Sequence, residues 1–161
     1  MNKVEELRFL ILAAQREGSR MFTSVLRPLG LTSSQSEVLR VLFDYEPLSL
    51  AELGKLLICE TGSPSRLVNR MVEGGFIEQK KSETDSRKVT LTLTKKGRDA
   101  VLKIMAVETE TYHSIDTMLE GSSVSELIDV LWKFVDGKPT GNALHLRKTQ
   151  KKKITLTGEF K

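Results

Sequence analysis

The sequence predicts a mainly α-helical protein that contains one small β-hairpin. Apolar residues recur at spacings of three and four over most of the chain, which is the periodicity of amphipathic helices. Between residues 76 and 94 the period changes to two, and a polar stretch interrupts it. The 161 residues suit one compact domain with helical extensions better than two independent domains.

Two helices are expected at the start of the chain. The first covers about residues 3–27 and stops before Pro28, because proline removes a backbone donor and clashes with the preceding turn. The second begins at Ser34, and Glu37 follows three residues later as in a capping box. Its apolar side chains point inward, and it ends before Pro47.

Two shorter helices follow, joined by a tight turn. One begins at Ser49, with Glu52 at the position of a capping box. The next has Pro64 in its first turn, where the missing amide hydrogen costs nothing, and it ends at Gly74. A pair of short helices around a tight turn predicts a helix-turn-helix motif.

The remaining pattern is a hairpin followed by helices. Residues 76–79 and 89–94 are predicted strands, and the charged stretch from Lys80 to Lys88 is a protruding loop between them. Helices are then expected over residues 95–119 and 123–135.

Residues 137–161 lose the apolar pattern after three helix breakers. The segment is basic, and we expect a flexible tail. Its Ile154-Thr-Leu-Thr run could instead pair as a strand. As a disordered end it would only solubilise the protein, and a second contact with nucleic acid is the alternative.

Positive charge is concentrated in two parts of the chain. Residues 61–98 hold nine basic and four acidic side chains, and residues 137–161 hold seven and one. Residues 99–136 hold two basic and eight acidic side chains, so the overall charge of +4 conceals a strong asymmetry. A basic block inside the folded part is typical of a surface that binds a polyanion, although a solvated basic face is the alternative.

Several classes of protein are disfavoured. The single cysteine, Cys59, cannot form an intramolecular disulfide, and the two histidines do not form a metal-binding cluster. The apolar stretch 9–14 is too short to span a membrane. We find no nucleophile motif and no phosphate-binding glycine loop, so we expect neither an enzyme nor a bound cofactor or metal. A cytoplasmic protein without membrane contact is the expectation.

The helix that begins near Pro64 has one polar face. Its apolar arc contains Leu67, Val68 and Met71, and the opposite arc contains Arg66 and Asn69. Arginine can bond guanine bidentately, asparagine can bond adenine, and short serine side chains let a helix lie deep in the major groove. Such a face is often plain surface, but here it belongs to the second helix of a turn motif and precedes a basic hairpin.

The hairpin tip carries four basic residues within Lys80–Lys88. Arg87 is the candidate for an adjacent minor groove, whose negative potential suits a guanidinium, and Asp85 could orient it. An ordinary charged hairpin is the alternative. The complete predicted DNA-binding set is Ser34, Thr61, Ser63, Ser65, Arg66, Asn69, Arg70, Lys80, Lys81, Arg87 and Lys88, with Asp85 as the wing-orienting residue.

These motifs together resemble the multiple antibiotic resistance regulator (MarR) family. The segment Asp85-Ser-Arg-Lys-Val-Thr-Leu-Thr-Leu-Thr94, followed by Lys-Lys-Gly, is similar to the wing signature of that family. Leu31-Thr-Ser-Ser-Gln35 resembles the start of its second helix. The segments 50–57 and 65–77 resemble its third and recognition helices, and the match runs in order from about residue 5 to residue 136.

The resemblance implies a winged helix-turn-helix with N- and C-terminal dimerisation helices. Residues 1–136 would form this domain, in which 3–30 and 95–136 are dimerisation helices and 31–94 bind DNA. A homodimer would bind a pseudo-palindromic operator on double-stranded DNA as a repressor, and a ligand or an oxidant would relieve the repression. A winged-helix adaptor that acts through protein partners without DNA is the alternative.

Two features depart from the family pattern, and Cys59 has two alternative roles. Glu60 lies just before the recognition helix, where its charge would repel phosphates, and the basic tail has no counterpart. Cys59 lies at the same turn and is expected to be a small buried filler rather than a redox sensor. A small-molecule effector would lie between the dimer helices and the winged domain. The candidate lining residues are Phe9, Met21, Phe22, Phe43 and Tyr45, and the alternative is that they are core residues.

Overall fold

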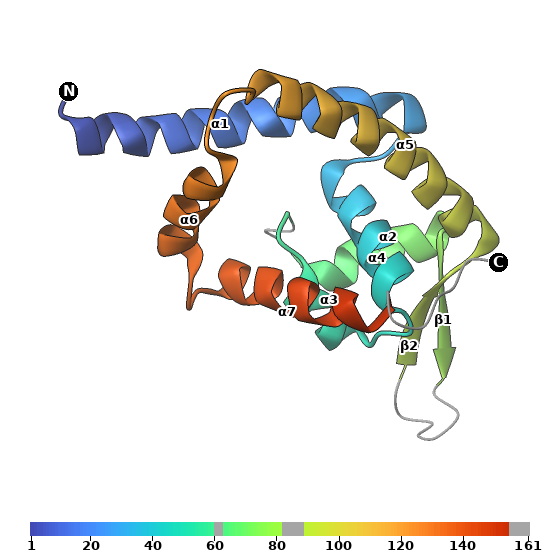
Figure 1. The fold of residues 1–161 in the computed structure, drawn as a ribbon. Helices are drawn as coiled ribbons and strands as arrows, with labels where there is room; N and C mark the ends of the chain where they lie inside the picture. The colour runs from blue at the N-terminus through green and yellow to red at the C-terminus, as the bar shows by residue number, and fades with distance from the viewer. Residues whose placement is uncertain (60–62, 82–88, 155–161) are drawn as a thin grey trace.

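The computed structural model describes residues 1–59, 63–81 and 89–154. It is mainly helical and contains one two-stranded antiparallel sheet, as the sequence predicts (Figure 1). The elements in order are α1 (Lys3–Leu26), the 3-10 turn η1 (Arg27–Leu29), α2 (Ser33–Tyr45), α3 (Leu50–Leu56), α4 (Pro64–Glu73), β1 (Ile77–Lys81), β2 (Val89–Leu93), α5 (Lys95–Met118), α6 (Val124–Val135) and α7 (Pro139–Ile154).

The hydrophobic core lies under α2, and the helix-turn-helix and the hairpin pack around it. Val38, Leu39 and Leu42 of α2 are fully buried, and so is Leu53 of α3. The apolar arc of α4 is buried against them, as its periodicity predicts. Because this one core holds α3, α4 and both strands, the position of the recognition helix is fixed by packing rather than by its own helical propensity.

Local signals explain most helix starts, with one correction. Ser49 and Glu52 form the predicted capping box at α3. The predicted box of Ser34 and Glu37 is wrong, because Thr32 caps α2 and Gln35 completes the box. The carboxylate of Glu37 accepts hydrogen bonds from a distant turn instead, so it is not available for the helix start.

The wing begins as a regular hairpin. Strand β1 pairs with β2 so that Ile77 faces Leu93 and Lys81 faces Val89. The predicted loop therefore starts too early, because Lys80 and Lys81 belong to a paired strand rather than to the hairpin tip. Residues 82–88, which include Asp85, Arg87 and Lys88, lie outside the described part of the chain.

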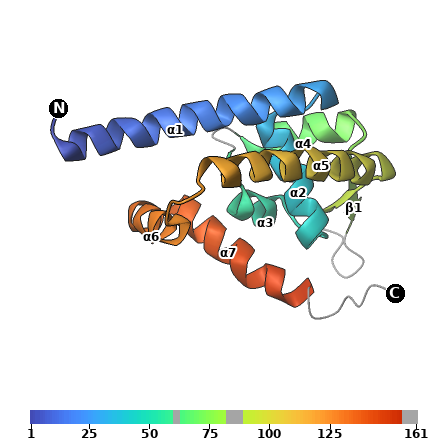
Figure 2. The same cartoon turned by 45° about the horizontal axis from the view of Figure 1, so that its top comes forward.

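Two helices carry large apolar side chains on their surface. On α1 the exposed set is Val4, Leu7, Phe9, Leu10 and Leu12, and on α6 it is Val124, Leu127, Ile128, Val130, Leu131 and Phe134. No residue of α6 is buried. The N-terminal half of α1 also extends away from the winged helix (Figures 1 and 2). Exposed apolar helix faces of this kind are typical of interaction sites.

The sequence prediction is wrong about the tail for residues 139–154. These residues form helix α7, which turns back from α6 and packs on α3 and α2 (Figure 1). Gly141 and Ala143 are buried, and Gly141 lies against the Val135 carbonyl at the end of α6, where a small residue allows a close approach. Ile154, the first residue of the possible strand, is the last residue of α7, and the rest of that run lies outside the described residues.

Across the described residues, no helix combines the length and apolar character that a bilayer crossing requires.

Candidate nucleic-acid interface

Helix α4 presents a polar face to solvent. Ser63, Arg66, Asn69 and Arg70 are exposed, and Ser65 is half-buried. Leu67, Val68 and Met71 on the opposite side have relative exposures of 3% or less. The helix is therefore held by its buried arc, and the predicted recognition residues of this helix share one accessible side.

The start of α4 has no side-chain cap among the described residues. Ser63 is the N-cap residue, but its side chain makes no capping hydrogen bond and instead lies 2.6 Å from the Ser65 hydroxyl. Pro64 occupies the first turn. Backbone N–H groups at a helix start favour an approaching phosphate, and serine hydroxyls can bond the same group. Thr61, also in the predicted set, lies outside the described residues.

The wing places basic groups beside this helix. Lys80 and Lys81 are exposed on β1, where Lys80 Nζ lies 2.8 Å from Glu78 Oε1. That hydrogen bond from Lys80 lowers the pKa of the Glu78 carboxyl. Lys80 and Lys81 are the last two residues of β1, and β2 is joined to the segment before α3 by a bridge between Leu48 and Leu91.

The turn before α4 is held by a carboxylate that sequence reasoning did not identify as functional. Glu37 Oε1 accepts from the Ile58 amide at 2.9 Å, and Glu37 Oε2 accepts from the Cys59 amide at 2.7 Å. Ser34, a predicted DNA contact, donates its hydroxyl to the Cys59 carbonyl at 3.3 Å. Ser34 and Glu37 thus hold both backbone groups of Cys59. The sequence offered no signal for this role, because Glu37 shares its helix face with the polar residues Ser33, Ser34 and Arg40.

The prediction that Cys59 is a buried filler is wrong, because the residue is exposed. It also lines a pocket, where partial burial raises the pKa of its thiol and the neighbouring Glu37 carboxylate raises it further. A raised pKa reduces the thiolate fraction, and the thiolate is the reactive form.

A pocket of about 750 Å³ lies where α1, α2, α5 and α7 approach the turn before α4. Of the five predicted effector residues it contains Phe22 and Tyr45, whereas Phe9, Met21 and Phe43 are not among its lining residues. Phe9 and Phe43 are exposed elsewhere, and Met21 is half-buried. The sequence pattern could not separate them, because α1 and α2 both carry apolar residues on exposed and on core-facing sides.

The polar groups of this pocket are unusual. Arg40 Nε lies 3.3 Å from Glu108 Oε2, but Arg40 Nη1 is buried and makes no hydrogen bond within the described residues. Tyr45 and Tyr112 also line the pocket, and burial raises the pKa of both phenols, helped by Asp44 and Glu108 respectively. Both hydroxyls are therefore protonated near neutral pH and can donate hydrogen bonds.

The arrangement of a buried helix-turn-helix core, an exposed polar face on α4 and an adjacent hairpin defines a winged helix-turn-helix DNA-binding protein. Residues 31–97 match the family model described as a winged helix DNA-binding domain. The chain is also similar to a structure of mutant MarR from E. coli complexed with operator DNA, with a TM-score of 0.73 and 25% identity. The similarity covers 83% of this chain and 96% of that one.

Curated relatives give the same result. The chain is 33% identical over 108 residues to the organic hydroperoxide resistance transcriptional regulator of Bacillus subtilis (strain 168), covering 67% of this chain and 72% of that protein. It is 30% identical over 126 residues to the HTH-type transcriptional regulator MgrA of Staphylococcus aureus, covering 78% and 81%. The chain belongs to the MarR family of DNA-binding transcriptional regulators, which confirms the resemblance read from its motifs.

Proposed function

We propose that this protein is a ligand-responsive repressor that binds a pseudo-palindromic operator as a homodimer, and that it is not an enzyme. The observation that carries the proposal is one chain with both an exposed polar recognition helix and two exposed apolar helices. A two-fold dimer formed through the apolar helices would present two copies of α4 on one side of the assembly. Such a pair reads two half-sites of a symmetric DNA sequence.

The dimer surface is supported by the apolar faces of α1 and α6. Leu127, Leu131 and Phe134 of α6 each leave between 41% and 48% of their surface exposed. Leu7 and Leu10 of α1 are exposed by 41% and 58%. Covering such residues contributes roughly 25 cal/mol for each Å² removed from water, so association through both helices is strongly favoured.

We expect the free protein to have twice the chain mass of 18.1 kDa in solution. Light scattering at micromolar concentration measures this directly. Leu131→Glu should shift the mass toward the monomer, because a charge would be buried in the apolar interface. The control Glu120→Lys changes an exposed turn residue and should leave the mass unchanged. A parent protein with the mass of one chain would contradict the dimer.

The operator should be a pseudo-palindrome whose half-site centres lie about one helical turn apart. Selection from a random duplex library, followed by footprinting of the best-bound sequence, tests this geometry. The expected footprint has two protected major-groove segments on one side of the duplex. In cells, a promoter that contains the selected site should lose expression when the protein is present. A single protected half-site under a dimer, or increased expression, would refute this form of the proposal.

The ligand is proposed to be a small aromatic acid in the pocket beside the turn. Arg40 Nη1 has no hydrogen-bond partner among the described residues, Phe22 and Tyr112 form a tilted ring pair with centroids 6.1 Å apart, and the Tyr112 phenol adds a donor. Aromatic walls with a few convergent polar groups are typical of ligand sites. Structures that share this fold include an organohalide-sensing regulator in its 2,4-dichlorophenol bound form and the Bordetella bronchiseptica regulator BpsR, whose DNA binding is regulated by 6-hydroxynicotinic acid.

Benzoate and 6-hydroxynicotinic acid are suitable probes for this pocket. At least one of them should release the parent protein from its selected duplex. Arg40→Met keeps a long side chain without the charge, so we expect DNA binding to persist and about tenfold more acid to be needed for release. Arg20→Met on α1 removes the same charge outside the pocket and serves as the control. An unchanged response of Arg40→Met would show that the acid binds elsewhere.

A further inference from the structure

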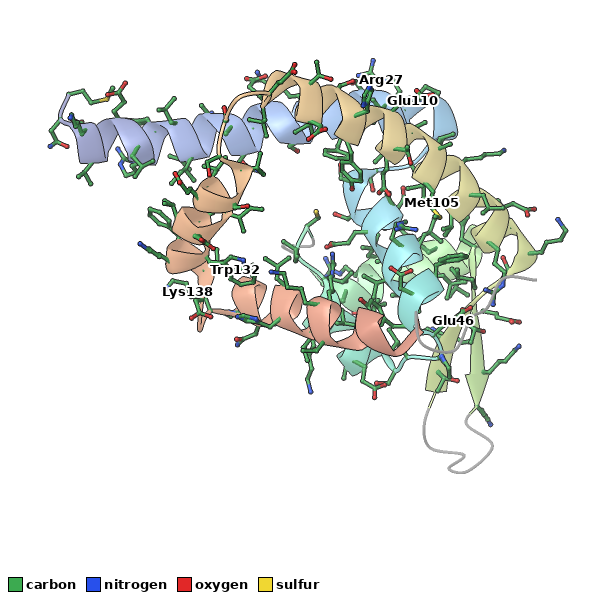
Figure 3. The ribbon with its side chains drawn as sticks, in the orientation of Figure 1. Arg27, Glu46, Met105, Glu110, Trp132 and Lys138 are labelled. Atoms are coloured by element: carbon green, nitrogen blue, oxygen red, sulfur yellow. The ribbon has the colours of Figure 1, made fainter. Side chains whose placement is uncertain are left out.

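Helix α7 follows α6 at a closely packed corner. A Cβ atom at Gly141 would collide with the Val135 carbonyl, so the two helices meet at their closest approach there. Trp132 stacks on the His145 ring with centroids 4.5 Å apart, and His145 Nε2 lies 3.0 Å from Asp136 Oδ1. Figure 3 shows Trp132 and Lys138 at this corner. These contacts fix the direction in which α7 returns to the winged helix.

The far part of α7 is anchored to the helix-turn-helix by Arg147. Its Nε donates to the Leu56 carbonyl at 2.8 Å, at the end of α3, and its Nη2 donates to the same oxygen and to Glu37 Oε1. The Tyr45 hydroxyl of α2 donates to the Arg147 backbone carbonyl at 2.9 Å. One guanidinium therefore joins α7 to the end of α3 and to the carboxylate that holds the following turn.

Glu37 connects Arg147 to the turn that precedes α4. Its carboxylate bonds the amides of Ile58 and Cys59, and Cys59 comes four residues before the N-cap of α4. The Glu37 side chain is 8% exposed and the Arg147 side chain 27%, so both charges are largely screened from water and their hydrogen bonds are strong. Movement of Arg147 would leave the carboxylate with two amide donors and no cationic partner.

We propose that Arg147 and Glu37 are positioning residues for DNA recognition, through which α7 fixes the turn that leads into α4. Neither side chain reads DNA. They set the placement of the helix start, and a recognition helix must be held within about 0.5 Å for its base contacts to form. Because Glu37 and Arg147 also line the 750 Å³ pocket, a ligand there would meet the same contact that fixes the turn.

The test rests on the proposed DNA-binding function and uses the full chain. Affinity is measured by fluorescence anisotropy for the selected duplex and for a scrambled duplex of equal length and composition, at several salt concentrations. Arg147→Ala should lower the affinity ratio between the two duplexes about tenfold, comparable to losing one good base contact. Arg147→Lys, which keeps the charge but not the forked donor geometry, should recover part of this ratio.

Lys148→Ala is the matched control. It removes the same charge from the adjacent residue of α7, where Lys148 Nζ lies over the Trp132 ring and not on α3. Scrambled-duplex affinity and salt slope should be equal in Arg147→Ala and Lys148→Ala, because a positioning residue neutralises no phosphate. Amide hydrogen exchange at Ile58 and Cys59 should be faster in Arg147→Ala and Arg147→Lys than in Lys148→Ala.

The possible outcomes distinguish failure of the positioning role from failure of the DNA-binding function. If the parent discriminates between the duplexes and Arg147→Ala does so equally well, the positioning role is refuted while the DNA-binding function stands. A reduced salt slope in Arg147→Ala alone would make Arg147 a direct phosphate contact and would also refute it. If Arg147→Ala does not fold, unchanged exchange at Ile58 and Cys59 in Arg147→Lys decides against the proposal. A parent without discrimination overturns the proposed function together with this inference.

Discussion

Replacing Glu37 with alanine is expected to lower the free energy of unfolding by about 3–5 kcal/mol, the cost of removing one partner from a buried ion pair. The carboxylate is 8% exposed and accepts from two backbone amides and a guanidinium. Its removal leaves the Ile58 and Cys59 amides without their acceptor. The unsatisfied amide of half-buried Ile58 costs about 1–3 kcal/mol, whereas water can reach the exposed Cys59. The partial exposure of Arg147 favours the lower end of the range, because water can replace the lost partner.

Urea unfolding at one fixed protein concentration measures this loss, since the stability of a dimer depends on concentration. Glu37→Gln keeps the shape and one acceptor oxygen, so it should fall between the parent and Glu37→Ala. Glu120→Ala removes an equal charge from an exposed turn and should stay within about 0.5 kcal/mol of the parent. Equal midpoints for Glu37→Ala and Glu120→Ala would show that the carboxylate contributes nothing to the fold.

The elements with strong periodicity could be predicted from sequence. Leu67, Val68 and Met71 recur on one side of α4, and the structure buries all three. Alternating leucines and threonines likewise predicted β2, where Leu91 and Leu93 are buried. In such segments a single local pattern decides both the secondary structure and the buried face.

The start of α2 shows why local signals have limits. Thr32–Gln35 and Ser34–Glu37 satisfy the same capping pattern, and only the first forms the box. The choice depends on a turn more than twenty residues away, whose two amides are satisfied by the Glu37 carboxylate. No pattern within one helix contains that information.

Helix α7 could not be predicted, for a different reason. Gly141 meets the end of α6, Arg147 bonds the end of α3, and the described α7 residues that are buried, Gly141 and Ala143, are small. A glycine and a basic residue in a segment with Pro139 favour the interpretation as a tail. The contact that fixes the helix is polar and long-range, and hydrophobic periodicity cannot detect such contacts. The same limit hid Arg40 and Tyr112, the polar residues of the pocket.

Arg66→Ala is expected to cost about 1–3 kcal/mol of binding free energy at the selected operator, the value of one good contact with a base edge. Arg66 is exposed on the polar face of α4 in its first turn, where recognition helices enter the major groove. Selectivity should relax at one position in each half-site. The variant should remain folded and dimeric, because Arg66 lies opposite the buried arc that holds the helix.

Arg87→Ala should give a different pattern of loss, since Arg87 is proposed to act through charge and groove shape. Binding should weaken for many sequences alike, and the slope of affinity against salt should flatten by roughly one unit for each phosphate-like contact removed. The two arginines carry equal charge, so each variant serves as the control for the other in salt titrations on selected and scrambled duplexes. Arg66→Ala should change the ratio between the duplexes, and Arg87→Ala should change both affinities together. If both variants bind both duplexes like the parent, neither arginine contacts DNA, and the adaptor alternative becomes the better account of this winged helix.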